Sequence, residues 1–193
     1  GKYKEEVLDY LYDLKGTGED SYDVAGAAKG GSLFETHFKL FQTASEKCEG
    51  IKQIYDFCHE SIGQVVIHKN EVVPPNSVVM ILDSWAHITN DGGFHDTHNH
   101  PNCSWCGIYC IEKGNSNQKT QNGINRFHSP LNSSMVDAGN YYLQAGAWDW
   151  EPSDGHLVVF PSYLMHSALP YSGDIDRIVI SFNSTTVVQQ EAI

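Results

Sequence analysis

Histidines gather at two places in this chain of 193 residues, and their spacing is typical of metal ligands. His98 and His100 stand two positions apart in the segment 94–101, directly after a Gly-Gly turn. In an extended segment, residues two apart point to the same face, so both imidazoles can aim at one point. A third histidine, His166, ends a second, mostly apolar segment that starts at Gly155. Two distant segments can therefore deliver three imidazoles to one place.

Neutral imidazoles bind iron, zinc, copper and nickel. A local pair and one distant histidine form a three-point facial site, which leaves open positions for oxygen, water or a chelating cosubstrate. Ten residues of the chain are histidine, so a lone His-x-His pair carries little weight. The pair gains weight from the Gly-x5-Pro-x4-His segment and from Arg177 after the next turn. The sequence therefore predicts a metal site made of His98, His100 and His166.

Short apolar segments around these histidines predict a β-rich fold. They are rich in Val, Ile, Tyr, Phe and Trp, and clusters of turn-forming residues separate them. Several short strands joined by turns indicate a sandwich, barrel or jelly roll. A polar stretch over 113–140 predicts a long loop, and such loops often carry function. The predicted strands cover residues 78–88, 105–112, 141–148, 156–160 and 175–183.

The first third of the chain has a helical spacing of apolar residues instead. Stripes of this kind predict one helix over 3–14 and another from about 43 to 67. The length of the chain fits one domain. We expect a single domain over 1–193, in which residues 1–70 form a helical buttress for a β-rich core over 71–193.

Charge and cysteine content exclude several classes of partner. The chain has 24 acidic and 12 basic residues, and this negative balance disfavours a nucleic-acid partner. No apolar stretch approaches the roughly 18 residues of a membrane span, and no signal-peptide pattern opens the sequence. Five cysteines cannot all pair internally, and free thiols fit a reducing cytoplasm, where we expect this protein. Cys103 and Cys106 form a Cys-x-x-Cys pair, but no second pair completes a zinc site.

The run from Trp85 to Asn183 resembles the Fe(II)/2-oxoglutarate-dependent oxygenases, in particular a branch of 2OG-Fe(II) oxygenases from bacteria and phages. The resemblance covers about the C-terminal half of the chain, and the helical first third has no part in it. The matching pieces are Ser84-Trp85, His98-Asn99-His100-Pro101, Gly107-Ile108-Tyr109, the block from Gly155 to Ser162, His166, and the block from Arg177 to Asn183.

The resemblance implies a double-stranded β-helix, which is the jelly roll that cupins share. It implies Fe(II) at one open end of this core, held by His98, His100 and His166. It further implies a dioxygenase that uses 2-oxoglutarate and molecular oxygen to hydroxylate a small molecule or a side chain.

The cosubstrate 2-oxoglutarate is expected to chelate iron through its 2-oxo acid end and to pair with Arg177 through its far carboxylate. A guanidinium binds a carboxylate through two parallel hydrogen bonds and keeps its charge at ordinary pH. Ser181 or Tyr109 could add a hydroxyl group to that carboxylate. The other interpretation of Arg177 is a structural ion pair with Asp174 or Asp176.

The chain departs from the usual pattern of the wider superfamily, which is His-x-Asp or His-x-Glu. His100 takes the carboxylate's place, and the loss of a negative charge could change metal preference. Asp96 could supply a carboxylate from nearby. Trp85 and His87 share a strand face and, with Asn183, are candidates for the substrate pocket, although a plain core role for the first two is equally open.

Two alternatives remain at this point. The first is a cupin-type three-histidine metalloprotein without 2-oxoglutarate, which could be a dioxygenase, an isomerase or a ligand-binding module. No Glu follows His100 at the cupin distance, and Tyr163 stands where cupins usually have Gly. The second is a non-catalytic jelly roll, with Trp148 and Trp150 among the aromatic residues of a carbohydrate platform. A homodimer is allowed by edge strands and aromatic residues, but nothing requires it.

Overall fold

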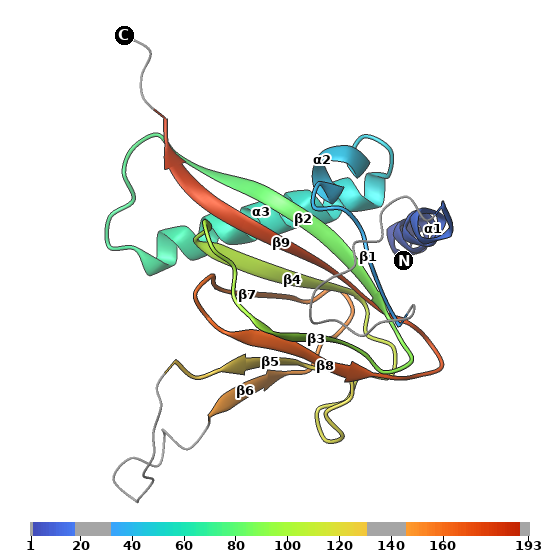
Figure 1. Ribbon diagram of the computed structural model, residues 1–193. Coiled ribbons are helices and arrows are strands. Elements are labelled where there is room, and N and C mark those ends of the chain that lie inside the picture. Colours follow the sequence, from blue (N-terminus) through green and yellow to red (C-terminus); the bar gives the residue numbers. More distant parts are fainter. Residues whose placement is uncertain (1, 18–31, 131–145, 190–193) are drawn as a thin grey trace, which may run out of the picture.

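Two antiparallel β-sheets face each other, and helices cover the outer side of one of them (Figure 1). The computed structural model describes residues 2–17, 32–130 and 146–189. The helices are α1 (Lys2–Thr17), α2 (Leu40–Ala44) and α3 (Glu49–Lys69). The strands are β1 (Leu33–Glu35), β2 (Ser77–Thr89), β3 (Gly93–His98), β4 (Trp105–Glu112), β5 (Asn125–His128), β6 (Ala147–Trp150), β7 (Leu157–Pro161), β8 (His166–Tyr171) and β9 (Arg177–Val188).

The five-stranded sheet has the order β1-β2-β9-β4-β7, and the four-stranded sheet has the order β3-β8-β5-β6. Neighbours far apart in sequence pair in both sheets, as in a jelly roll. The predicted class, mainly β with flanking helices around a double-stranded β-helix, is confirmed. Strands β2, β4, β7 and β9 fall on the predicted segments 78–88, 105–112, 156–160 and 175–183. Residues 141–145 of the remaining predicted strand lie outside the described residues, and β6 begins only at Ala147.

The long loop predicted over 113–140 needs a correction. Residues 125–128 form β5, which pairs with β6 and β8 at the centre of the four-stranded sheet. The polar composition of this stretch hid a strand in which only alternate residues, Asn125 and Phe127, are buried. Residues 131–140 of the predicted loop lie outside the described part of the chain.

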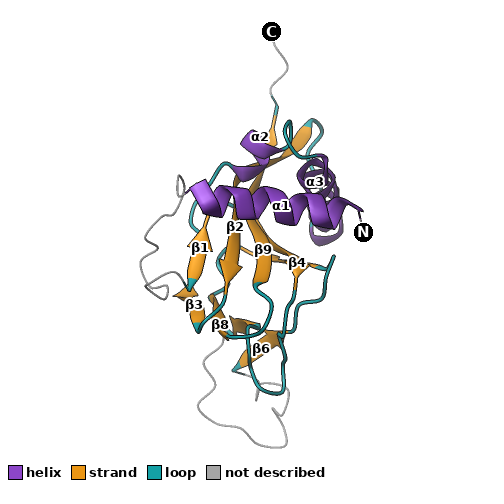
Figure 2. Ribbon diagram, turned by 90° about the vertical axis from the view of Figure 1, so that its right-hand side faces the viewer, coloured by secondary structure: helices purple, strands orange, loops and turns teal. Residues whose placement is uncertain are grey.

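Alternation along β9 separates the two sides of the large sheet. Ile178, Ile180 and Phe182 pack into the core that the sheet shares with the helices. Residues of the other parity, such as Arg177 and Ser181, face the space between the sheets. Figure 2 shows the helices on the side of the large sheet that faces away from β3 and β8. The helices thus cover the back of the sheet, and its front is free to form a site.

The second predicted helix, over 43–67, is in fact two helices. Helix α2 ends at Ala44, and the backbone is extended at Cys48 before α3 begins. The break is stabilised by Glu6 of α1, whose carboxylate accepts hydrogen bonds from the first backbone N–H groups of α3 at Glu49 (3.0 Å) and Gly50 (3.2 Å).

The grouping into a 1–70 buttress and a 71–193 core within one domain stays a prediction. In the described part of the chain, no helix is long and apolar enough to cross a membrane.

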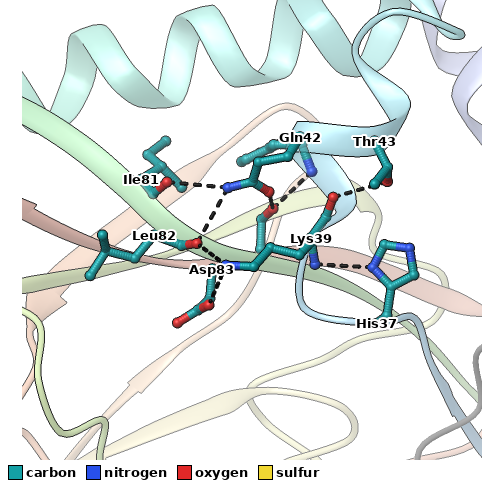
Figure 3. A network of polar contacts seen from close by, with 9 residues as sticks. His37, Lys39, Gln42, Thr43, Ile81, Leu82 and Asp83 are labelled. Carbon is teal, nitrogen blue, oxygen red and sulfur yellow. Dashed lines mark hydrogen bonds and ion pairs between the residues drawn. The ribbon is translucent and has the colours of Figure 1, made fainter.

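A β-bulge in β2 decides which side chains face the second sheet. Ile81 pairs with Ser184 and Asp83 with Asn183, so Leu82 is an extra residue in the ladder. Because of it, Ile81 points to the helices but Trp85, four residues later, points to the other side. The bulge is fixed from outside, as Figure 3 shows: the Leu82 carbonyl accepts hydrogen bonds from Lys39 Nζ (2.9 Å) and Gln42 Nε2 (3.3 Å).

Candidate metal and cosubstrate site

A cavity of about 450 Å³ lies between the two sheets. Its walls are the inward-facing residues of β2, β4 and β9 on one side and of β3 and β8 on the other. Polar and apolar groups share the lining, and histidine is the most frequent polar residue in it. The lining includes Glu35, Asp83, Trp85, His87, His95, His98, His100, Cys106, Asn125, Phe160, His166, Arg177, Val179, Ser181 and Asn183.

Three of these histidines converge on one point. His98, the last residue of β3, pairs with His166, the first residue of β8. The Nε2 atoms of His100 and His166 are 3.3 Å apart, and the backbone N–H of His100 donates to Ser162 O at 3.1 Å, which holds the segment after β3 in place. One ligand atom from each of His98, His100 and His166 lies within 4.8 Å of the others. The spacing in the sequence predicted this juxtaposition.

The ring nitrogens of this group are arranged to accept a cation. The Nδ1 of His166 lies 3.0 Å from Leu164 O, and the Nδ1 of His98 lies 2.6 Å from Asp96 O. A carbonyl oxygen only accepts, so each Nδ1 carries the proton and each Nε2 keeps a lone pair. Burial, together with the neighbouring rings, lowers the pKa of His166 to about 3 and that of His100 to about 4. Neutral imidazoles with free Nε2 atoms are the form that binds a metal.

The chemistry of this donor set fits a first-row transition metal. Ligands about 2.1 Å from one ion stand roughly 3 Å from each other, and the 3.3 Å between the His100 and His166 nitrogens is of that size. The side chain of Asp96, which could have supplied a carboxylate, is exposed and takes no part in the group. The three imidazoles therefore form the group by themselves, without a carboxylate.

Arg177 is the second notable group of the cavity. It is 2% exposed, and its Nη2 donates to Asn125 Oδ1 at 2.5 Å. Its Nε is buried without a hydrogen-bond partner, and no described acidic residue forms an ion pair with it, Asp174 and Asp176 included. Burial lowers the pKa of Arg177, but a guanidinium still keeps its proton. A buried cation with an unpaired hydrogen-bond donor costs free energy unless an anion binds to it. This geometry therefore suits a carboxylate ligand.

The other predicted site residues divide into two groups. Ser181, Trp85, His87 and Asn183 all line the cavity. Tyr109 does not: it lies on the helical side of β4, where its ring contacts Phe57 of α3 with centroids 6.0 Å apart. Strand alternation explains this, since Cys106 and Ile108 of β4 face the cavity, and Tyr109 has the opposite parity. The structure therefore separates the Tyr109 hydroxyl from Arg177.

Sequence reasoning missed a second polar group in the same cavity. Glu35, His87 and His95 each offer a ligand atom, and these atoms also lie within 4.8 Å of one another. Glu35 comes from β1, a strand of three residues that follows a polar stretch and gives no recognisable pattern. His95 reaches the cavity together with His98, although three positions separate them, because the pairing of β3 with β8 is irregular between these residues.

The cysteines do not form a metal site in the described part of the chain, where no candidate ligand group contains one. Cys103 and Cys106 lie with their Sγ atoms 3.7 Å apart, and Cys106 donates to Asn183 Oδ1 at 3.4 Å. Burial raises the pKa of the Cys106 thiol, so this group stays protonated and unreactive at neutral pH.

Comparisons with known proteins bear on this geometry. Residues 83–183, just over half of the chain, match the family described as "Putative 2OG-Fe(II) oxygenase". This range contains the three histidines and Arg177, and it leaves out Glu35. No curated protein matches the chain in sequence.

Several solved structures share the fold at low sequence identity. EvdMO1 aligns with a TM-score of 0.63 and 14% identity, over 99% of this chain and 44% of that one. A prolyl-4-hydroxylase from Pseudomonas putida aligns with a TM-score of 0.54 and 16% identity, over 94% of this chain and 86% of that one. HygX from Streptomyces hygroscopicus was solved with nickel and 2-oxoglutarate bound. It aligns with a TM-score of 0.53 and 10% identity, over 94% of this chain and 78% of that one. These likenesses show the fold, and the match over residues 83–183 shows that the chain belongs to the 2OG-Fe(II) oxygenase family.

Proposed function

We propose that this protein is an Fe(II)- and 2-oxoglutarate-dependent dioxygenase that hydroxylates a small molecule or a side chain. His98, His100 and His166 hold the iron. Arg177 and Ser181, which share one face of β9, bind the far carboxylate of 2-oxoglutarate. The substrate lies in the same cavity, against Trp85, His87 and Asn183.

One observation supports this proposal most strongly. Three neutral imidazoles face the same cavity as the buried guanidinium of Arg177, whose Nε has no hydrogen-bond partner. The imidazoles suit a divalent cation, and the guanidinium suits an anion. A ligand such as 2-oxoglutarate, with a chelating group at one end and a carboxylate at the other, satisfies both. HygX, which has the same fold, was solved with nickel and 2-oxoglutarate bound, and this supports the assignment.

Iron(II) with 2-oxoglutarate supplies the activation of oxygen and the oxidation of an unactivated carbon, with release of succinate and carbon dioxide. The protein's own residues orient the metal ligands and shield the reacting carbon from water. The backbone carbonyls of Leu164 and Asp96 fix the orientation of two imidazoles through their Nδ1–H groups. Val179 and Phe160 close the lining with apolar surface, which limits water around the reacting carbon.

The cupin alternative without 2-oxoglutarate is less well supported, because it leaves the buried Arg177 without a role. A cytoplasmic location and a homodimer stay predictions from the sequence.

Anaerobic titration tests the proposal. The protein purified without metal should give a visible charge-transfer absorption only when both Fe(II) and 2-oxoglutarate are present, and should release succinate slowly once oxygen is admitted. His166→Ala should abolish both signals. His59→Ala is a matched control, because His59 of α3 contacts Val79 O on the helical side of the sheet. Absorption that is independent of 2-oxoglutarate, or that persists in His166→Ala, would reject the proposal.

A further inference from the structure

The second polar group, formed by Glu35, His87 and His95, has the composition of a metal site. It offers one carboxylate and two imidazoles from three different strands. The Nε2 of His87 lies 2.6 Å from Glu35 Oε2, and the rings of His87 and His95 have centroids 5.6 Å apart. Two histidines and one carboxylate are a donor set that suits Fe(II), and imidazole and carboxylate ligands also bind Mn(II) and Zn(II).

Burial makes the carboxylate of this group unusual. Glu35 is 2% exposed, and its second oxygen, Oε1, has no hydrogen-bond partner among the described residues. A buried carboxylate oxygen without a partner costs free energy, so such groups are normally paired or bound to a metal. The contact with His87 satisfies only Oε2. A hydrogen-bonded His–Glu pair therefore does not account for the whole arrangement, because Oε1 remains without a partner.

The group adjoins the three-histidine site. His95 Nδ1 lies 3.1 Å from His98 Nδ1, and the centroids of these two rings are 4.2 Å apart. Glu35, His87 and His95 also line the same cavity as His98, so a cation held by them would share that space with the first one.

We propose that Glu35, His87 and His95 form a second divalent-metal site, so that the cavity holds two ions side by side. The first ion belongs to the function proposed above, whereas the second rests on Glu35, which lies outside the matched family region. The carboxylate supplies the negative charge that the three-histidine group lacks. The second ion offers open positions to oxygen atoms of a substrate in the cavity.

Counting Mn(II) ions tests this site without 2-oxoglutarate or turnover. Metal-free full-length protein is loaded with Mn(II), passed through a desalting column so that weakly held surface ions are lost, and analysed for bound metal. We expect two equivalents for the wild-type protein and one for Glu35→Gln, which keeps the shape but removes the charge. Asp83→Asn is the matched control, because Asp83 lines the same cavity and belongs to neither group, and it should keep two equivalents.

Electron paramagnetic resonance adds a readout that does not depend on Glu35→Gln folding well. Two neighbouring Mn(II) ions broaden each other's signal, so the wild-type spectrum should be broad. His166→Ala should bind one equivalent and give the sharp lines of an isolated ion. One equivalent in the wild-type protein that His166→Ala removes would overturn the second site and leave the proposed function intact. One equivalent that only Glu35→Gln removes would support this site and reject the three-histidine one.

Discussion

Replacing Arg177 by methionine separates a ligand-binding role from a structural one. Methionine also has an unbranched side chain, but it lacks the charge of Arg177 and its unpaired Nε–H group. Loss of one partner of a buried, hydrogen-bonded charge pair costs about 2–4 kcal/mol of binding free energy. Since about 1.4 kcal/mol is a factor of ten, the dissociation constant of 2-oxoglutarate should rise by about 30- to 1000-fold.

The stability of the ligand-free protein should change much less. The substitution loses the hydrogen bond to Asn125, worth about 1 kcal/mol, but it also removes a buried charge that lacks a counter-ion. These effects oppose each other, so we expect the melting temperature without 2-oxoglutarate to stay within about 4 °C of the wild-type value.

Thermal denaturation with Mn(II), with and without 2-oxoglutarate, measures both quantities at once. At 100 times the dissociation constant, the ligand stabilises the wild-type protein by about 2.7 kcal/mol, or about 5–10 °C. In Arg177→Met the same concentration should give about 0.9 kcal/mol or less, which is about 4 °C or less. Arg126→Met is the control, because Arg126 pairs with Asp149 in β6 and does not line the cavity. A full ligand shift in Arg177→Met, or a ligand-free protein that melts far lower, would refute the assigned role.

Other substitutions test the packing of the fold, the role of Tyr109 and a surface ion pair. Gly107→Ala should destabilise the protein by about 1–3 kcal/mol in chemical denaturation, because an added Cβ would lie 2.3 Å from Phe182 Cζ; an unchanged midpoint would contradict this packing. Tyr109→Phe should leave the dissociation constant of 2-oxoglutarate unchanged. A rise of about tenfold or more, equal to about 1.4 kcal/mol of binding free energy, would mean that the Tyr109 hydroxyl does bind the cosubstrate. Arg126 holds the pKa of Asp149 below its usual 3.8, so the pair should stabilise the fold at neutral pH and lose this contribution as the carboxyl protonates below about pH 4. Asp149→Asn should therefore lower the melting temperature more at pH 7 than at pH 3.

The parts of the site that the sequence predicted depend on local geometry. His98 and His100 are two apart beside a strand, and Arg177 and Ser181 are four apart within one, so strand alternation places each pair on one face. Tyr109 lies outside the cavity lining, and the sequence could not show this because alternation within one strand does not say which face of the neighbouring strand it matches. That relation depends on the pairing of β4 with β9, where Ile108 stands opposite Ser181.

Glu35 could not have been found from the sequence, because nothing local marks it. Its strand has three residues, and it joins the sheet only through pairing with the far end of β2, where Glu35 stands opposite His87. A contact over 52 positions is a product of tertiary structure. The carboxylate missing from the His-x-His motif is thus present in the cavity, but it comes from the region of the chain that the family resemblance does not cover.

The bulge at Leu82 lets β2 present Ile81 to the helices and both Trp85 and His87 to the cavity. Upstream of the bulge, Ile81 faces the helices. If Leu82 instead took a regular position in the ladder, uninterrupted alternation would turn His87, six residues after Ile81, to that same side, away from His95. The bulge persists because the displaced Leu82 carbonyl is satisfied by side chains from the segment that follows β1. That segment follows Glu35 directly, so the contacts that fix the bulge also hold β1 against β2. The same short stretch of chain therefore supplies Glu35 and fixes the bulge that precedes His87, so it helps to position both partners of the Glu35–His87 contact.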